Sequence, residues 1–255
     1  FLAWAVSWRA AFAIAAAAAL ITFSAIRITV PKVPALPDSG FAAQFRFLRS
    51  LEPWLVLGAI GLGNGGFFAY YSYVNPVMEH VAAVPASMMS VVITLAGAGM
   101  VLGNLFCAKI SSSFSDESLA AAGQGVLLLS LASVFFLAHW SPAAIALTTL
   151  AAGCVFFISG PEQVLMIRNA KEGQLLAASL AQVSFNAGNA VGAWLGGLPI
   201  DAGKAANWAA MPGFFLALAG FGLLFVNWLI HRVREEERTA GRIAALQDQI
   251  QSKMP

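Results

Sequence analysis

Seven apolar segments, each close to the length that crosses a lipid bilayer, constrain this sequence more than any other feature. A helix needs about 20 apolar residues to span the hydrocarbon core. Of the 255 residues, 59% are hydrophobic and only 10% are charged, against about 25% charged residues in soluble domains. The sequence therefore predicts an all-α membrane protein with seven transmembrane helices, at Ala10–Val30, Trp54–Met78, Ala86–Ile110, Leu119–Trp140, Ala143–Ile167, Leu175–Leu198 and Ala209–Ile230.

This composition also excludes several classes of protein. A soluble enzyme is excluded, and no nucleophile–base pair or phosphate-binding loop is present, so we expect no catalytic residues and no cofactor. The net charge of +2 gives no reason to expect a nucleic-acid partner. Both cysteines, Cys107 and Cys154, lie in apolar segments, which favours buried thiols over a disulfide or a metal site. The expected partners are the lipid bilayer and a small-molecule substrate.

The placement of Lys and Arg predicts the orientation, because basic residues concentrate in cytoplasmic loops. If the span Ala10–Val30 ends in the cytoplasm, only Arg9 and Lys204 lie outside. The remaining 12 of the 14 basic residues then lie inside, and the reverse topology would invert this ratio. We therefore expect a cytoplasmic C-terminus in a multi-pass protein.

Four regions follow from this pattern. Residues 1–30 hold the end of one helix and a complete span, 31–53 form a cytoplasmic linker rich in proline, 54–230 form a six-helix bundle, and 231–255 form a charged cytoplasmic tail. The chain begins with Phe1 inside an apolar run, so we expect a piece of a longer protein. In the linker, Phe41, Phe45 and Leu48 share one helical face, which favours an interfacial helix; a partly ordered linker is the alternative.

Polar residues recur on single faces of two spans. Asn64, Phe68 and Tyr71 follow one another at four- and three-residue steps, and so share a helical face. A second polar stripe lies in the span Leu175–Leu198. Polar groups are costly in lipid, so both stripes should face a cavity or a partner; hydrogen bonding between helices is the alternative. The second stripe consists of Ser179, Gln182, Asn186 and Asn189.

A carboxylate lies inside the span Ala143–Ile167. Glu162 and Gln163 directly follow a Gly160–Pro161 break. Glu162 precedes Arg168 by six residues, which corresponds to about 9 Å along a helix. An ionisable group at such a depth indicates a functional site, so we predict a direct role of Glu162 in substrate or proton handling, with snorkelling to the interface as the alternative.

Glycine stripes indicate where helices approach closely. Small residues at four-residue spacing let two membrane helices pack backbone to backbone. The most polar spans, the second, third, fifth and sixth, should line the interior, while the fourth and seventh should face lipid. Glycines at this spacing occur in two of the lining spans, as Gly99 and Gly103 and as Gly188, Gly192 and Gly196.

Several short motifs follow one another along nearly all of the chain: Trp8-Arg9-x-x-Phe12, Gly63-Asn64-x-Gly66, Gly99-Met100-Val101-Leu102-Gly103-Asn104, Pro161-x-Gln163, Asn169-Ala170-Lys171 and Phe185-Asn186-x-Gly188. Each motif is weak by itself. In this order they resemble the drug:proton antiporter-1 branch of the major facilitator superfamily.

This resemblance implies a fold of twelve helices in two halves. The chain would then hold the end of helix 5, helix 6 and the C-terminal six-helix half, with the N-terminal half as a missing partner. Two departures from the family pattern stand out. The gating motif expected after the span Ala86–Ile110 is reduced to one basic residue, Lys109, and Glu162 replaces an apolar residue.

The resemblance implies a secondary active transporter of the bacterial inner membrane that exports a small sugar-like or drug-like solute. Alternating access around a midplane site would move the solute, driven by the proton gradient. Uptake by the same fold is one alternative. A seven-helix receptor or light-driven pump is a second, although a retinal pump needs a lysine in the last helix and Ala209–Ile230 has none.

Overall fold

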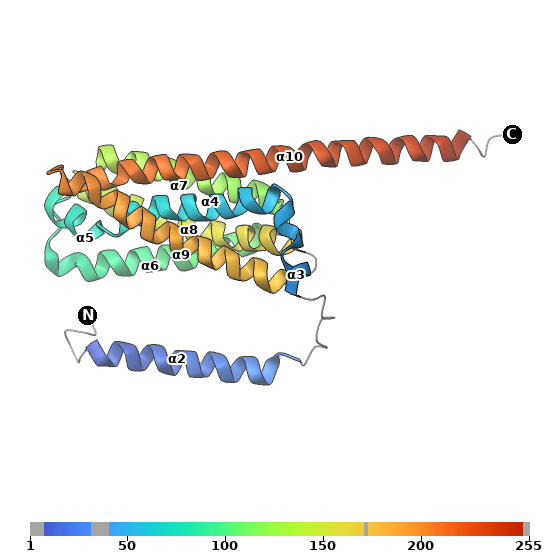
Figure 1. Cartoon of the computed structure of the whole chain (residues 1–255). Helices are drawn as coiled ribbons and strands as arrows, with labels where there is room; N and C mark the ends of the chain where they lie inside the picture. The colour runs from blue at the N-terminus through green and yellow to red at the C-terminus, as the bar shows by residue number, and fades with distance from the viewer. Residues whose placement is uncertain (1–7, 32–40, 171–172, 252–255) are drawn as a thin grey trace. The chain divides into compact units, whose positions relative to one another are not determined.

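The computed structural model describes residues 8–31, 41–170 and 173–251, which form helices joined by short turns (Figure 1). No strand occurs in these ranges, so the predicted all-α fold is confirmed. Each of the seven predicted spans coincides with a helix of at least 20 residues. These helices are α2 (Trp8–Thr29), α4 (Glu52–Tyr71), α6 (Met89–Ile110), α7 (Asp116–Leu137), α8 (Ser141–Asn169), α9 (Gln174–Asp201) and α10 (Ala210–Gln251).

Within the described residues, 5 helices are long and apolar enough to cross a membrane. They are α2, α6, α7, α8 and α10, which makes the chain a multi-pass membrane protein. The other two, α4 and α9, are long enough, but they carry the two polar stripes and many glycines. That α4 and α9 also cross the membrane stays a prediction.

The chain divides into two compact units, residues 1–39 and residues 40–255. The first unit contains α2. Several expectations lie outside the described residues: the helix end in residues 1–7, the proline-rich part of the linker in 32–40, Lys171 of the Asn169-Ala170-Lys171 motif, and the last residues of the tail, 252–255.

The second unit is a bundle in which six long helices lie side by side (Figure 1). Helix α8 packs against α6 and α7, while α4 packs against α9 and α10. These two groups are joined where α4 contacts α8 and where α10 contacts α7. Most of the largest buried side chains in the bundle come from α4, α7, α8 and α10, and they include Phe67, Tyr70, Leu127, Leu131, Ile158 and Leu224.

Glycines mediate the closest contacts in this bundle. A Cβ atom added at Gly188, Gly192 or Gly196 of α9 would overlap a backbone carbonyl oxygen of α4. The oxygens belong to Gly61, Gly65 and Ala69, so α4 and α9 touch over three successive turns. Backbone contact of this kind requires glycine, because any side chain would separate the helices.

The second glycine stripe joins α6 to α8. A Cβ at Gly99 would overlap the carbonyl oxygen of Thr149, and one at Gly103 would overlap that of Gly153. Gly99 and Gly103 therefore occupy the α6–α8 contact. A buried hydrogen bond ties α4 to the same helix α8, since the hydroxyl groups of Tyr70 and Thr148 lie 2.5 Å apart.

The second predicted span was expected to continue to Met78, but α4 ends at Tyr71. A short segment, α5 (Val74–Pro76), and a π-helical turn, η2 (Val77–Val81), follow it. Pro76 explains the break, because its ring clashes with the carbonyl of Ser72, four residues earlier, and removes that carbonyl's helical donor. The chain then enters the next long helix, α6, through the turn η3 (Ala86–Met88).

Two further boundaries differ from the expectation. The linker helix is divided into α3 (Phe41–Gln44) and the 3₁₀ turn η1 (Arg46–Arg49). Leu48 of η1 packs against the bundle core, and Phe45 is 38% exposed. That this segment lies at the membrane interface stays a prediction. At the other end, α10 continues through Ile230 to Gln251, so residues 231–251 of the predicted tail are helical. That they lie in the cytoplasm stays a prediction.

Candidate functional site

A cavity of about 440 Å³ lies between α4, α8 and α9. One helix, α8, supplies most of its wall, and Pro161 lies inside α8 without ending it. Gly160 faces open space, since no atom lies within 4 Å of a Cβ added there. The residues that line the cavity are Ile60 of α4, Val155, Phe156, Ser159, Gly160, Glu162 and Gln163 of α8, and Ala181, Gln182 and Phe185 of α9.

Glu162 is the ionisable side chain among these lining residues. It is only 2% exposed, and its Oε1 atom has no hydrogen-bond partner in the described part of the chain. The buried Asn64 of α4 donates its amide to the backbone carbonyl of Ile60 at 2.8 Å. A buried polar atom without a partner is costly, so Oε1 marks a position where a donor from elsewhere would be stabilised.

The polar stripe of α9 lies partly on this cavity. Gln182 lines it, and the exposed Asn186 donates to the backbone carbonyl of Gln182 at 2.9 Å. Asn189 lies one turn further along α9 and does not line the cavity. Its Oδ1 atom is buried and has no partner among the described residues. The stripe therefore extends from the cavity along α9. Polar atoms without a partner among the described residues occur at Glu162 on α8 and at Asn189 on α9.

Aromatic rings connect the cavity to the predicted face of α4. Phe185 of the cavity wall packs edge-to-face on Phe68, with ring centroids 6.0 Å apart. Phe68 in turn contacts the ring of Tyr71, at 6.2 Å, and Tyr71 stacks on the buried Phe67 at 4.7 Å. Phe68 thus contacts Phe185 of the cavity wall and Tyr71 contacts Phe68, but neither Phe68 nor Tyr71 lines the cavity.

Of the eight residues predicted for the substrate pathway, Glu162, Gln163 and Gln182 line the cavity, whereas Asn64, Phe68 and Tyr71 of α4 are not among its lining residues. A role of these residues in a substrate pathway stays a prediction. Asn186 and Asn189 lie beyond the cavity on α9. Helix α6, which was expected to line the interior, contributes none of the lining residues; it packs against α8. Lys109, the remnant of the expected gating motif, is exposed in the last turn of α6.

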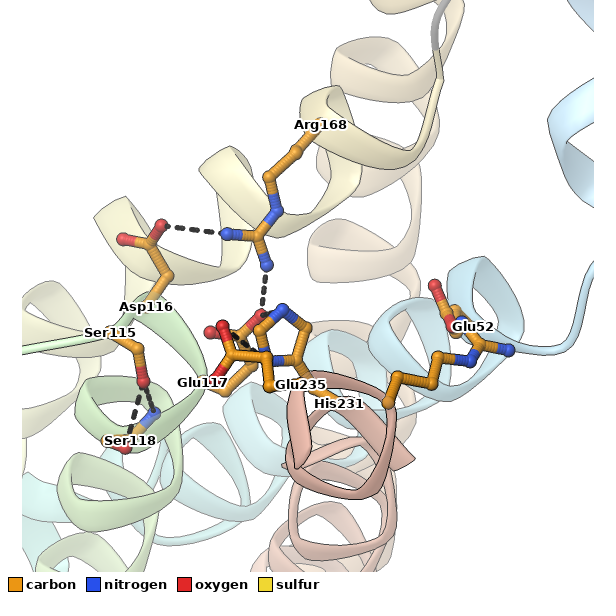
Figure 2. Close-up of polar contacts among 9 residues, drawn as sticks. Glu52, Ser115, Asp116, Glu117, Ser118, Arg168, His231 and Glu235 are labelled. Atoms are coloured by element: carbon orange, nitrogen blue, oxygen red, sulfur yellow. Dashed lines mark hydrogen bonds and ion pairs between the residues drawn. The ribbon is translucent and has the colours of Figure 1, made fainter. Parts of the chain in front are cut away.

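A second polar site, at one end of the bundle, was missed by the sequence analysis. Figure 2 shows a charged cluster in which Arg168, at the end of α8, forms ion pairs with Glu117 and, at 3.8 Å, with Asp116 of α7. His231 of α10 lies 3.4 Å from the same Glu117 oxygen. The charged cluster consists of Glu52, Asp116, Glu117, Arg168, His231, Arg234 and Glu235.

The charged cluster joins four helices at this end. Glu52 in the first turn of α4 pairs with Arg234 of α10, beside the pairs that Arg168 makes with α7. Glu117 is only 1% exposed, and its second oxygen, Oε2, has no partner in the described residues. Both Asp116 and Glu117 lie in the first turn of α7, where the helix dipole favours negative charge. The cluster can therefore hold the ends of α4, α7, α8 and α10 together.

We expect cysteines placed at positions 64, 186 and 189 in the full-length protein to react with a water-soluble thiol reagent. Asn186 is exposed, and atoms of Glu162 and Asn189 have no hydrogen-bond partner among the described residues, which indicates that water or a solute reaches this region. A cysteine at Phe215, an exposed apolar position of α10, serves as the control and should stay unreactive in lipid. Labelling followed by mass spectrometry measures both. Protection of all three test positions under every condition would contradict a water-accessible cavity.

Long apolar helices and a cavity with a buried carboxyl on its wall are the features expected of a membrane transporter. Comparison with known proteins supports this class. The chain is 34% identical over 220 residues to the putative transporter AraJ of Escherichia coli (strain K12), covering 86% of this chain and 56% of AraJ. It is 25% identical over 218 residues to the uncharacterized MFS-type transporter YfhI of Bacillus subtilis (strain 168), covering 85% of this chain and 54% of YfhI.

A further relative is the purine ribonucleoside efflux pump NepI of Escherichia coli (strain K12), 26% identical over 206 residues, with 79% of this chain and 50% of NepI covered. No protein-family model matches the chain. The chain spans about half the length of these curated relatives. Its homologues are MFS-type transporters, and the resemblance to the major facilitator superfamily that its motifs predicted is confirmed.

Proposed function

We propose that this chain forms part of a secondary active transporter that exports a small organic solute in exchange for protons. The observation that carries the proposal is Glu162, a buried carboxyl on a cavity between three helices, whose Oε1 atom has no partner among the described residues. An ionisable group in this position can bind a proton or a solute donor in turn. The efflux direction is supported by the relative named as a purine ribonucleoside efflux pump.

Alternating access requires a second wall around the cavity. The chain spans about half of each relative, and we propose that it supplies helix 6 and the C-terminal six-helix half of a twelve-helix fold. The N-terminal half would then close the cavity opposite α8 and α9. The exposed amide groups of Gln182 and Asn186 suit a wall shared with that half, because they offer hydrogen bonds to a solute between the halves.

The charged cluster lies at the end of the bundle that we assign to the cytoplasm of a bacterial inner membrane. This assignment follows the distribution of basic residues, 12 of 14 on one side, and it also gives α10 a cytoplasmic C-terminal end. In this orientation, Lys109, Arg168 and Arg234 all lie at the cytoplasmic end. The cluster would keep the cytoplasmic ends of four helices together while the two halves rock about the cavity.

Proton-coupled transport can be tested on the full-length protein in liposomes that enclose a pH-sensitive dye. The solute panel consists of purine ribonucleosides, sugars and aromatic amines. Under an imposed pH gradient, we expect the addition of one of these classes to cause protons to cross the liposome membrane, which the dye reports. Empty liposomes are the control. Proton coupling would be refuted if the gradient moved no member of the panel and no added solute moved protons. Proton movement in the same direction as the solute would indicate uptake.

A further inference from the structure

We propose that the bundle holds one acyl chain of a membrane phospholipid in an apolar groove that runs along α8, between α6 and α7. The groove has a volume of about 1070 Å³. Its lining residues on α8 run from Ser141 to Phe157, which corresponds to about 24 Å along the helix at 1.5 Å per residue. The groove is separate from the cavity between α4, α8 and α9, so this proposal does not depend on the proposed transport activity.

The packing of three helices creates this groove. Both α6 and α7 pack along α8, but they scarcely touch each other, so α8 forms the floor between them. Glycines deepen the groove, because Gly99, Gly123 and Gly153 are buried lining residues without a side chain. Cys154, which is only 6% exposed, also lines it. The groove therefore reaches below the surface of the bundle.

The chemistry of the wall excludes a hydrophilic ligand. Among the lining residues that the structure describes, none is charged, and the hydroxyl groups of Ser141 and Thr149 are the strongest polar groups. Ser141 already donates to the carbonyl of Ala82 at 2.6 Å, and Thr149 donates to that of Ile145 at 2.9 Å. Both donors are thus used within the protein, so an occupant would be held by apolar contacts.

The surroundings of the groove indicate hydrocarbon as the occupant. The helices α6, α7 and α8 are all long and apolar enough to cross a membrane. The lining residues Leu102, Phe106 and Leu150 are 65%, 58% and 47% exposed, so the groove continues the apolar outer surface of these helices. In a bilayer, lipid chains adjoin such a surface in place of water. An unfilled groove would cost its walls their dispersion contacts.

The size of the groove favours an acyl chain over a helix of a second copy of this protein. A helix with its side chains is about 10–12 Å across, so 24 Å of helix fills roughly 1,900–2,700 Å³. The groove offers about 1070 Å³, whereas an acyl chain is much thinner than a helix and can lie along the whole floor. This volume also lies at the upper end of the range of about 300–1,000 Å³ for small-molecule sites, which favours an elongated ligand.

A photoreactive benzophenone amino acid in the full-length protein can identify the occupant. It is placed at position 126, where Val126 of α7 lines the groove, and in a control at position 215, where Phe215 of α10 is exposed outside the groove. The protein is washed at length in detergent and then irradiated. We expect mass spectrometry to find one phospholipid attached at position 126 at least tenfold more often than at position 215, because loosely bound lipid is lost to the detergent.

A second pair of substitutions tests whether the groove itself holds the lipid. Ala122→Trp fills the groove one helical turn from position 126 and should lower lipid attachment there at least fivefold. Ala219→Trp, at an exposed position of α10, is the matched control and should leave it unchanged. Size-exclusion chromatography checks that each variant folds. Ala146→Phe, which fills the groove from α8, serves in place of Ala122→Trp if that variant does not fold.

Three results would overturn the proposal. Equal phospholipid attachment at positions 126 and 215 would mean that the groove meets only exchangeable bilayer lipid. Attachment of position 126 to a second copy, or to α2 of the same chain, would identify a different occupant. Unchanged lipid attachment in a folded groove-filling variant would show that the lipid lies elsewhere. The comparison of positions 126 and 215 needs no filling variant, and none of these results bears on proton coupling.

Discussion

Replacing Gly192 with leucine is expected to separate α4 from α9 and to abolish most of the folded protein. The α-carbon of Gly192 faces the carbonyl of Gly65 so closely that even a Cβ would overlap it. Inserting a few atoms into a packed interior already costs about 1–3 kcal/mol, and a leucine pressed against backbone costs more. A membrane protein with a folding stability near 5–15 kcal/mol would lose a large part of it. Size-exclusion chromatography and thermal unfolding in detergent measure the loss.

Gly97 offers a matched control for this substitution. It also lies inside a long helix, α6, but no atom lies within 4 Å of a Cβ added there. Gly97→Leu should therefore leave the elution profile and the unfolding temperature close to those of the wild type. If Gly192→Leu and Gly97→Leu behave alike, the backbone contact between α4 and α9 is not what holds these helices together.

Replacing Arg168 with alanine is expected to destabilise the bundle by about 3 kcal/mol. Removing one partner of a buried ion pair typically costs 3–5 kcal/mol, because the other charge stays buried without compensation. Here Glu117 is 1% exposed, and among the described residues its remaining side-chain neighbour would be His231, at 3.4 Å. The lower end of the range applies since the Arg168 side chain is 46% exposed. Chemical unfolding in detergent, with and without the substitution, measures the difference.

The pair Arg232–Glu236 provides the control for this second prediction. Its side chains are 62% and 70% exposed, and an exposed pair contributes about 0–1 kcal/mol. Arg232→Ala should thus have little effect. Adding Glu117→Gln to Arg168→Ala should recover stability, because a neutral side chain needs no countercharge. An equal loss in Arg168→Ala and Arg232→Ala, or no recovery in the double variant, would show that the charged cluster does not brace the bundle.

The helices and the position of Glu162 could be predicted because both follow from local patterns. Apolar length marks each helix, and helical spacing alone puts Gly188, Gly192 and Gly196 on one face. The identity of the partner helix could not be predicted, since any helix with a smooth face would satisfy the same spacing. The structure supplies that information, by placing these glycines against carbonyl groups of α4.

The charged cluster could not be predicted for the same reason. Arg168 and Glu117 are 51 residues apart, and Arg234 and Glu52 are 182 residues apart, so only the tertiary fold brings them together. Glu117 also lies just before a predicted span, where an acidic residue is commonly explained by the helix dipole. One signal for the charged cluster was available in the sequence. Its acidic and basic residues all lie at ends of spans that were predicted to be cytoplasmic.

The end of α10 shows a different limit of prediction. A change from apolar to charged residues after Ile230 marks where a helix leaves the hydrocarbon core. It does not mark where the helix ends, because Glu, Arg, Ala, Leu and Gln are all strong helix formers. The polar segment therefore continues the same helix to Gln251.

The length of α10 has a mechanical consequence. At 1.5 Å per residue, its 42 residues extend about 63 Å, roughly twice the thickness of the hydrocarbon core. In Figure 1 it projects well past the other helices of its unit. Because α10 is held in the bundle at one end only, a small change in its tilt there would displace its far end by a much larger distance.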